Sequence, residues 1–92
     1  MTQVNRASSS DGSGVTLVFL GRLESVAGGG SRKLALSPTI DALIETLEPS
    51  LVSALREPRV KLAVNGILLQ DTDAPVLKDG DEIAFLPPVS GG

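Results

Sequence analysis

Residues 15–20 read Val15-Thr16-Leu17-Val18-Phe19-Leu20, a run of apolar and β-branched side chains. Such a run is typical of a strand that is buried on most of both faces. A strand of this kind lies in the middle of a sheet, with neighbours on either side. Gly14 precedes the run and Gly21 ends it. The sequence therefore predicts that residues 15–20 form a central strand.

The residues that follow predict a second strand beside the first. Arg32–Leu36 alternates polar and apolar side chains, which is typical of a short strand that pairs back on its predecessor. Between the strands, the spacing of Leu23 and Val26 predicts a helical turn that closes onto the core. Gly28-Gly29-Gly30 then indicates a flexible loop. A phosphate-binding loop fits less well, because the glycine-lysine step of a P-loop is missing and no helical pattern follows.

A main helix is predicted after the second strand. Ser37 is a suitable N-cap, Pro38 fits the first helical position, and Asp41 lies in the first turn, where the helix dipole favours an acid. The apolar face repeats at i, i+3, i+4 and i+7, through Ile40, Leu43, Ile44 and Leu47. This helix is expected to pack across the sheet.

Prolines divide the helical region. Pro49 interrupts the main helix, and Pro58 ends a second, short helical stretch. The apolar residues of that stretch are Leu51, Val52 and Leu55. Three glutamates lie away from the apolar face and are expected to face solvent: Glu45, Glu48 and Glu57.

The strongest turn signal is Asn65-Gly66, which is typical of a two-residue β-hairpin. It lies between the alternating segment Val60–Val64 and the apolar segment Ile67–Gln70. A two-residue turn would pair Val64 with Ile67, Ala63 with Leu68 and Leu62 with Leu69. The first and third pairs are expected to face the helix, and the middle pair the other side of the sheet.

The last strand follows the turn Lys78-Asp79-Gly80 and spans Asp81–Leu86. Its period of two directs Ile83 and Phe85 inward, so that Ala84 and Leu86 point outward. The outward side of the predicted sheet is then apolar, through Val18, Leu20, Ala63, Leu68, Ala84 and Leu86. No second layer of helices is predicted to cover this patch, and such a patch marks a protein interface. We therefore expect Leu20, Leu68 and Leu86 to contact partner proteins.

The chain ends in a tail, Pro87-Pro88-Val89-Ser90-Gly91-Gly92. The prolines lack an N–H and stop the strand, and the two glycines let the chain end enter a channel too narrow for side chains. An extended tail of this length carries its terminal carboxylate on the order of 20 Å from the domain. The tail is therefore suited to delivering one reactive group, the carboxylate of Gly92.

The amino-acid composition leaves few reactive groups other than the chain end. The 92 residues include no cysteine, histidine, tryptophan or tyrosine, which excludes a thiol nucleophile, a disulfide framework, an imidazole base and the usual zinc sites. The hydrophobic content of 41% suffices for one modest core. A net charge of -3 argues against nucleic acid or an anionic membrane as partner and favours an electropositive protein surface.

The domain organisation is simple. Residues 1–13 are polar, cannot offset their ordering entropy by burial, and are expected to be a disordered extension. Residues 14–86 form the folded domain and residues 87–92 the tail. No run approaches the ~18 apolar residues of a membrane helix, and no signal-peptide pattern is present, so we expect a cytoplasmic protein.

The order of elements is strand, strand, helix, strand, strand, strand, with the first and last strands central and parallel. This order and the Gly-Gly ending resemble the β-grasp, ubiquitin-like fold, an α+β roll with a mixed sheet of about five strands on one main helix. More narrowly, the chain resembles the small, sulfur-carrying subunits of molybdopterin synthases. The resemblance covers about Val15 to Gly92. It is carried by 19–23, 26–28, 37–40, 42–43, 63–66 and 78–92, and most specifically by Phe85-Leu86 with the tail.

The resemblance implies a carrier cycle on Gly92. In that family an activating enzyme uses ATP to convert the C-terminal carboxylate to an acyl-adenylate, and a sulfur donor protein converts this to a thiocarboxylate. The large synthase subunit then receives the tail, and sulfur passes to cyclic pyranopterin monophosphate to make molybdopterin. By this resemblance the chain is a sulfur-donating subunit without a permanently bound cofactor, and the catalytic side chains belong to its partners.

Three alternatives stay open. A sulfur carrier of the thiamine pathway has the same fold and ending, although the Pro-Pro-Val-Ser run resembles the molybdopterin branch more. A ubiquitin-like tag would use the same carboxylate for isopeptide bonds to lysines, and a Gly-Gly end can also be a frayed terminus.

An acidic stretch precedes the tail and consists of Asp71, Asp73, Asp79, Asp81 and Glu82. These acids either line solvated turns or steer the protein toward a basic cleft.

Overall fold

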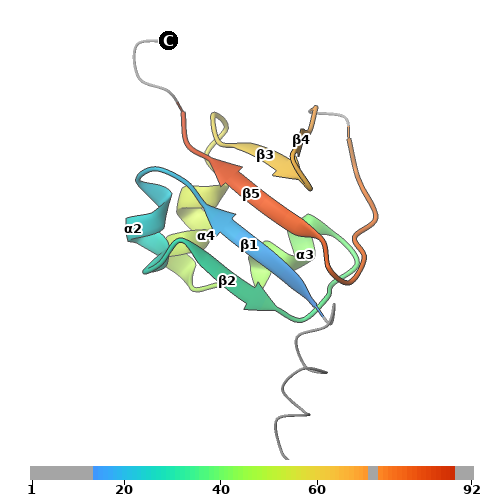
Figure 1. Ribbon diagram of the computed structural model, residues 1–92. Helices are drawn as coiled ribbons and strands as arrows, with labels where there is room; N and C mark the ends of the chain where they lie inside the picture. Colours follow the sequence, from blue (N-terminus) through green and yellow to red (C-terminus); the bar gives the residue numbers. More distant parts are fainter. Residues whose placement is uncertain (1–13, 71–72, 89–92) are drawn as a thin grey trace, which may run out of the picture.

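The computed structural model describes residues 14–70 and 73–88, and these residues form one mixed sheet with helices on one side (Figure 1). The strand order is β2-β1-β5-β3-β4. In chain order the elements are β1 (Val15–Phe19), α2 (Leu23–Ala27), β2 (Ser31–Leu34), α3 (Ile40–Glu45), α4 (Pro49–Leu55), β3 (Lys61–Val64), β4 (Ile67–Leu68) and β5 (Glu82–Leu86). The predicted disordered extension, residues 1–13, lies outside the described residues.

The first and last strands lie side by side and parallel at the centre of the sheet, as predicted (Figure 1). Leu17 pairs with Ile83, and Phe19 pairs with Phe85. β2 is antiparallel to β1 on one side, and β3 is antiparallel to β5 on the other. The N-terminal half of the chain is thereby joined to its C-terminal strand.

The core lies between the sheet and the helices. Val15, Leu17 and Phe19 of β1 are buried, as are Ile83 and Phe85 of β5. The inward direction of the β5 pair is therefore confirmed. The prediction that residues 15–20 are buried on most of both faces is wrong, because the intervening side chains of β1 are only partly buried and Leu20 is exposed. The physical reason is that the helices cover only one face of the sheet (Figure 1).

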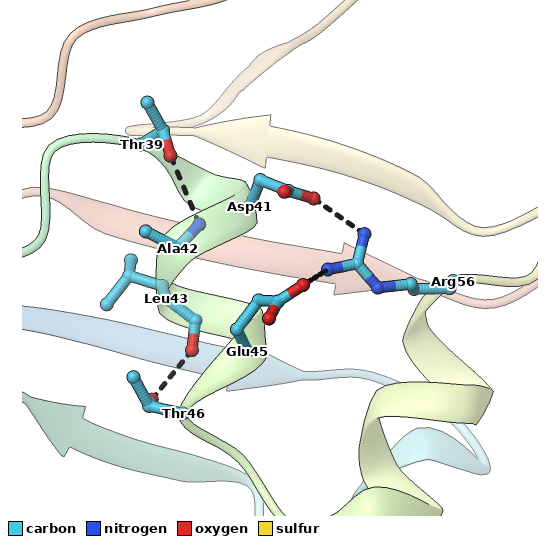
Figure 2. Close-up of polar contacts among 7 residues, drawn as sticks. All are labelled: Thr39, Asp41, Ala42, Leu43, Glu45, Thr46 and Arg56. Carbon is cyan, nitrogen blue, oxygen red and sulfur yellow. Dashed lines mark hydrogen bonds and ion pairs between the residues drawn. The ribbon is translucent and has the colours of Figure 1, made fainter.

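The helical layer begins two residues later than the sequence indicated. The N-cap of α3 is Thr39 rather than Ser37, and its Oγ1 accepts a hydrogen bond of 3.1 Å from the backbone N of Ala42 (Figure 2). Thr39 has the extended backbone of an N-cap, with φ -135° and ψ 161°, so the helix starts at Ile40 rather than at Pro38. Asp41 lies in the first turn, as predicted.

Pro49 divides the helical region into two helices, as predicted, and the main helix α3 is short. α3 ends at Glu45, and α4 begins at Pro49, which occupies its first turn. Leu51 and Leu55 of α4 are buried, as predicted. In α2, Leu23 and Ala27 are buried, whereas Val26 is 41% exposed. The contact with the core thus uses the i, i+4 positions rather than the predicted i, i+3 pair.

Two arginines tie the helices to their surroundings. Arg56, after α4, donates 2.6 Å and 3.1 Å hydrogen bonds to Asp41 and Glu45 of α3 (Figure 2). Both terminal nitrogens of Arg32, in β2, donate hydrogen bonds to the carboxylate oxygens of Glu48, with N···O distances of 2.8 Å and 3.1 Å. The predicted solvent-facing glutamates are exposed, but Glu45 and Glu48 also form these ion pairs.

The hairpin has the predicted register, with Val64 opposite Ile67 and Ala63 opposite Leu68. Asn65 has φ +50° and Gly66 φ +84°, which fits the primed turns that join antiparallel strands. The expected inward burial of Ile67 is wrong, since its side chain is 71% exposed. β4 is a two-residue edge strand, so Ile67 has no neighbouring strand on its outer side.

Asn65 also fastens the hairpin turn to the start of β5. Its Oδ1 accepts a 2.9 Å hydrogen bond from the N of Glu82, and its Nδ2 donates one of 2.9 Å to Asp81. This bond, together with one from the backbone N of Lys78, holds the pKa of the Asp81 carboxyl below its usual value. Asp81 is therefore buried with a hydrogen-bond donor for each of its carboxylate oxygens.

The Arg32–Glu48 ion pair should make the stability of the fold depend on pH. The hydrogen bonds from Arg32 lower the pKa of Glu48 from about 4.5 to about 2. A carboxyl whose pKa is lower in the folded state stabilises the fold above its unfolded pKa and loses that contribution as the pH falls through the folded pKa. We expect the stability difference between the wild type and Glu48→Gln to be constant above about pH 5 and to vanish toward about pH 2. Urea unfolding over this range measures it. Glu57→Gln, which removes a looser 3.8 Å ion pair with Arg22, is the control.

The Asn65 side chain should stabilise the fold in two separable ways. Asn65→Gly keeps the positive φ but loses the hydrogen bonds to Asp81 and Glu82, which should cost about 1–2 kcal/mol. Asn65→Ala also introduces strain at φ +50° and should cost about 1 kcal/mol more. Denaturant unfolding of both variants measures the two terms, and equal stability of the two would contradict the role of backbone strain.

Candidate functional site

The candidate site begins where β5 ends. The backbone N of Leu20 donates a 3.1 Å hydrogen bond to the O of Phe85, and Leu86 is the last strand residue. Pro87 and Pro88 follow, are half-buried and lie outside the strand, as the missing N–H of proline predicts. Val89, Ser90, Gly91 and Gly92, which were predicted to form the rest of the tail, lie outside the described residues.

The turn after β1 contacts the start of the tail. Gly21 has φ +56°, and a Cβ placed on it would lie 2.9 Å from Cγ of Pro87. The ring of Pro87 therefore rests directly on the backbone of Gly21. The sequence marks Gly21 as the end of a strand but does not predict its contact with Pro87. The signal that could have found this contact is the combination of a glycine after β1 with a proline after the parallel strand β5.

The outward face of the sheet is arranged in rows across the strands. One row crosses four strands through Val18, Ala84, Ala63 and Leu68, which are successive register partners. In the next row toward the tail, Leu86 lies opposite Lys61. Leu20 follows Phe19, the partner of Phe85, and so lies beside Leu86.

The structure therefore brings two of the predicted interface residues together at the root of the tail. Leu20 is 41% exposed and Leu86 is half-buried. Leu68 is 52% exposed and lies two strands from β5, one row further from the tail. Helices α2, α3 and α4 cover the opposite face of the sheet (Figure 1). The outward face is thus an apolar surface that is open beside Pro87.

Three acids of the acidic stretch have local hydrogen-bond partners, whereas Asp71 lies outside the described residues. Asp79 accepts a 2.8 Å hydrogen bond from the N of Gly14, and Asp81 is buried in the network with Asn65. Both lie at the start of β5, whereas the tail leaves from its other end. Asp73 caps its own turn through the N of Gln70. These residues thus have a role in local turn structure, and steering of the protein toward a basic cleft stays a prediction.

A groove of about 750 Å³ lies elsewhere, between α3, the end of α4 and the segment around residues 69–75. Its floor is apolar, and Asp41, Arg56 and Asp73 are among its lining residues. None of the predicted site residues lines it. Among residues 14–70 and 73–88, no group of three or more acidic side chains is suited to hold a metal ion. Within the same residues, no helix has the length and apolar character needed to cross a bilayer.

Comparison with known proteins identifies the family. The ThiS family matches residues 17–92, which include the whole sheet after its first two residues and the entire tail. This chain belongs to the ThiS family. The ThiS-family match covers the sequence motifs on which the predicted resemblance rested, and that resemblance is confirmed.

Individual relatives agree with this assignment. The molybdopterin synthase sulfur carrier subunit of Escherichia coli is 33% identical over 82 residues, which cover 85% of this chain and 99% of the relative. The structure of a protein–protein complex of subunits 1 and 2 of the molybdopterin-converting factor from Helicobacter pylori contains a similar chain. That chain is 25% identical with a TM-score of 0.60, and the match covers 85% of this chain and 97% of that one.

A third similar structure is that of SAMP1 from Haloferax volcanii. It is 26% identical with a TM-score of 0.63, over 85% of this chain and 98% of the other. These structures confirm the predicted β-grasp architecture of this ThiS-family chain. The five strands of the prediction are all present, and the helical region is divided at Pro49 as predicted.

Proposed function

We propose that this protein is the sulfur carrier subunit of a molybdopterin synthase. The observation that carries the proposal is the family match that runs to Gly92 and so includes the chain end. The Escherichia coli relative, named as a sulfur carrier subunit of that enzyme, is matched over 99% of its length. The proposed function needs no catalytic side chain on this protein, which suits a sequence without cysteine or histidine.

The reactive group in this proposal is the C-terminal carboxylate of Gly92. A carboxylate resists attack by a nucleophile, so it must first be given a better leaving group. An activating enzyme transfers AMP from ATP to the carboxylate, which forms an acyl-adenylate and releases pyrophosphate. Sulfur at the oxidation level of sulfide, delivered by a donor protein, then displaces AMP and leaves a thiocarboxylate. ATP is thus used on Gly92 by a partner and is not a resident cofactor of this chain.

The second half of the cycle takes place on the large synthase subunit. The tail enters that subunit, and its thiocarboxylate gives sulfur to cyclic pyranopterin monophosphate. The complex of subunits 1 and 2 of the related Helicobacter pylori factor supports a large-subunit partner. The outward face is the surface of this chain that suits docking, because it is apolar and lies beside Pro87. One docking contact there would bring the tail to the partner's active site.

Reconstitution tests the proposed function. The purified chain is incubated with an activating enzyme, ATP and a sulfur donor, and then with the large subunit and cyclic pyranopterin monophosphate. Intact-mass measurement should show replacement of one oxygen by sulfur, and molybdopterin should form. A chain that accepts sulfur but supports only thiazole formation with thiamine-pathway partners would show that the alternative pathway is the right one.

A second candidate function is protein conjugation. The likeness to SAMP1, which is named a small archaeal modifier protein, favours it. Such a modifier would join the Gly92 carboxylate to the ε-amine of a lysine, with loss of AMP from the same acyl-adenylate. Mass spectrometry distinguishes it by detecting lysines that carry the C-terminal fragment of this chain, Asp79–Gly92 after tryptic cleavage at Lys78. Conjugates that depend on Gly92 would establish this role, and their absence together with molybdopterin formation would leave sulfur transfer alone.

The chain end itself should be indispensable. Deletion of Gly92, or addition of one residue after it, moves the reactive carbon and should abolish adenylation or sulfur transfer, while the thermal unfolding curve stays unchanged. Gly91→Ala should impair the reaction too, because a Cβ strains a narrow channel. Pyrophosphate release measures adenylation and intact mass measures sulfur transfer. Full activity of the Gly92-deleted chain would refute the carrier mechanism.

The outward face should bind both partners in turn. Leu86→Asp, and Leu20→Asp at a more exposed position, should weaken binding to the large subunit and to the activating enzyme by about 1–3 kcal/mol. Leu68→Asp tests the row further from the tail. Leu36→Asp is a matched control, since Leu36 and Leu20 are both 41% exposed but Leu36 lies in the loop after β2. Calorimetry with folded variants measures the affinities, and equal losses for Leu20→Asp and Leu36→Asp would argue against this surface.

A further inference from the structure

The contact between Gly21 and Pro87 joins two segments that lie far apart in the sequence. Gly21 lies in the turn between β1 and α2, and Pro87 is the first residue after β5. A Cβ on Gly21 would lie 2.9 Å from Cγ and 3.7 Å from Cδ of the proline ring. Real Cβ atoms essentially never approach another heavy atom as closely as 2.9 Å. The proline therefore occupies space that only glycine at this position leaves free.

The turn that carries Gly21 is held on both sides. The N of Leu20 donates to Phe85 of β5 at 3.1 Å, and the O of Gly21 accepts from Glu24 of α2 at 3.1 Å. Leu23, at the start of α2, is 2% exposed in the core. The turn is thus fixed to the sheet, the helix and the core, and it offers a firm surface to the proline ring.

The chain that leaves this surface is stiff at its root. Pro87 has no N–H to continue the ladder with a neighbouring strand, so packing rather than a hydrogen bond from this residue supports it. Proline fixes its own φ, and a residue that precedes proline is confined to extended conformations. Leu86 and Pro87 both precede a proline. Because backbone rotation is restricted at Leu86 and Pro87, a displacement of the Pro87 ring also changes the direction of the chain that follows it.

We infer that Gly21 is a positioning residue for the C-terminal tail, because its bare backbone seats the ring of Pro87 and so sets the direction in which the tail leaves the sheet. This inference rests on the proposed function, since a direction matters only if the chain end must reach a partner's active site. Small misplacements of a reacting group far from the substituted residue can lower a rate by as much as ~100-fold. An added Cβ on Gly21 moves the ring and thereby misdirects the reactive end.

Gly28 provides a matched control at the other end of the same helix. It has φ +81° against +56° for Gly21, so alanine is strained at both positions. A Cβ on Gly28, however, meets nothing within 4 Å. Gly21→Ala and Gly28→Ala should therefore lose similar stability, and only Gly21→Ala should displace Pro87. Asparagine tolerates positive φ better than alanine, so Gly21→Asn and Gly28→Asn repeat the comparison if an alanine variant does not fold.

The functional test measures sulfur transfer from the thiocarboxylated chain to cyclic pyranopterin monophosphate on the large subunit. We expect Gly21→Ala to lower kcat by about tenfold or more relative to Gly28→Ala, with KM changed by less than about twofold because the outward face still docks. Pro87→Ala removes the ring atoms that the new Cβ meets. That variant is itself impaired, but adding Gly21→Ala to it should cause no further loss. Equal kcat for Gly21→Ala and Gly28→Ala, or an undiminished loss in the Pro87→Ala background, would overturn the inference.

A measurement on the free protein separates this inference from the proposed function. The natural chain has no cysteine, so Lys61→Cys, on the strand position opposite Leu86, accepts a single nitroxide label. Broadening of the Gly91 and Gly92 amide signals by that label should change in Gly21→Ala and stay the same in Gly28→Ala. Unchanged broadening in both variants would refute the positioning role. A wild type with no sulfur transfer would refute the proposed function, while the broadening still decides whether Gly21 directs the tail.

Discussion

The parallel pairing of β1 with β5 is the constraint on which the remaining structure depends. It brings Phe19 and Phe85 together with their rings stacked, 5.7 Å between centroids and 10° between planes. Such a pair contributes about 0.5–1.5 kcal/mol beyond the burial of its area. Both rings are essentially excluded from solvent and lie under the helices. Arg32 lies over the outer side of this stack, 5.9 Å from the centroid of Phe19, and its ion pair with Glu48 connects the stack to the start of α4.

The same pairing explains where the chain leaves the sheet after β5. Because β1 and β5 run in the same direction, the end of β1 and the end of β5 lie at one edge of the sheet. The turn at Gly21 and the tail at Pro87 are therefore neighbours, although they are separated by most of the sequence. An antiparallel pairing would have put the start of β1 beside the tail instead. The topology thus supplies both a seat for the tail and, through Leu20 and Leu86, an apolar surface next to it.

The two faces of the sheet have separate tasks. The helix side contains the core and provides stability through Leu17, Leu43, Leu51 and Ile83, which are almost fully buried. The outward side leaves apolar residues partly exposed to solvent. Such exposure lowers the solubility of a monomer, and it fits the proposed docking of partner proteins. The acids at the start of β5 contribute to the stability of the fold. Asp79 and Asp81 hold Gly14, Lys78 and Asn65, and they lie at the far end of the strand from the tail.

The sequence by itself determined the strands, the parity of their side chains, the Asn65-Gly66 hairpin and the family. These features depend on local conformational preference, on a period of two and on a motif at the chain end, all of which are written in neighbouring residues. The tertiary structure alone decided that Ile67 stays exposed, that Arg32 and Arg56 hold the helices, and that Gly21 meets Pro87. Each of these depends on distances between side chains and backbones that packing sets. No spacing along the chain encodes such distances, because they arise only when segments that are separated in the sequence pack together.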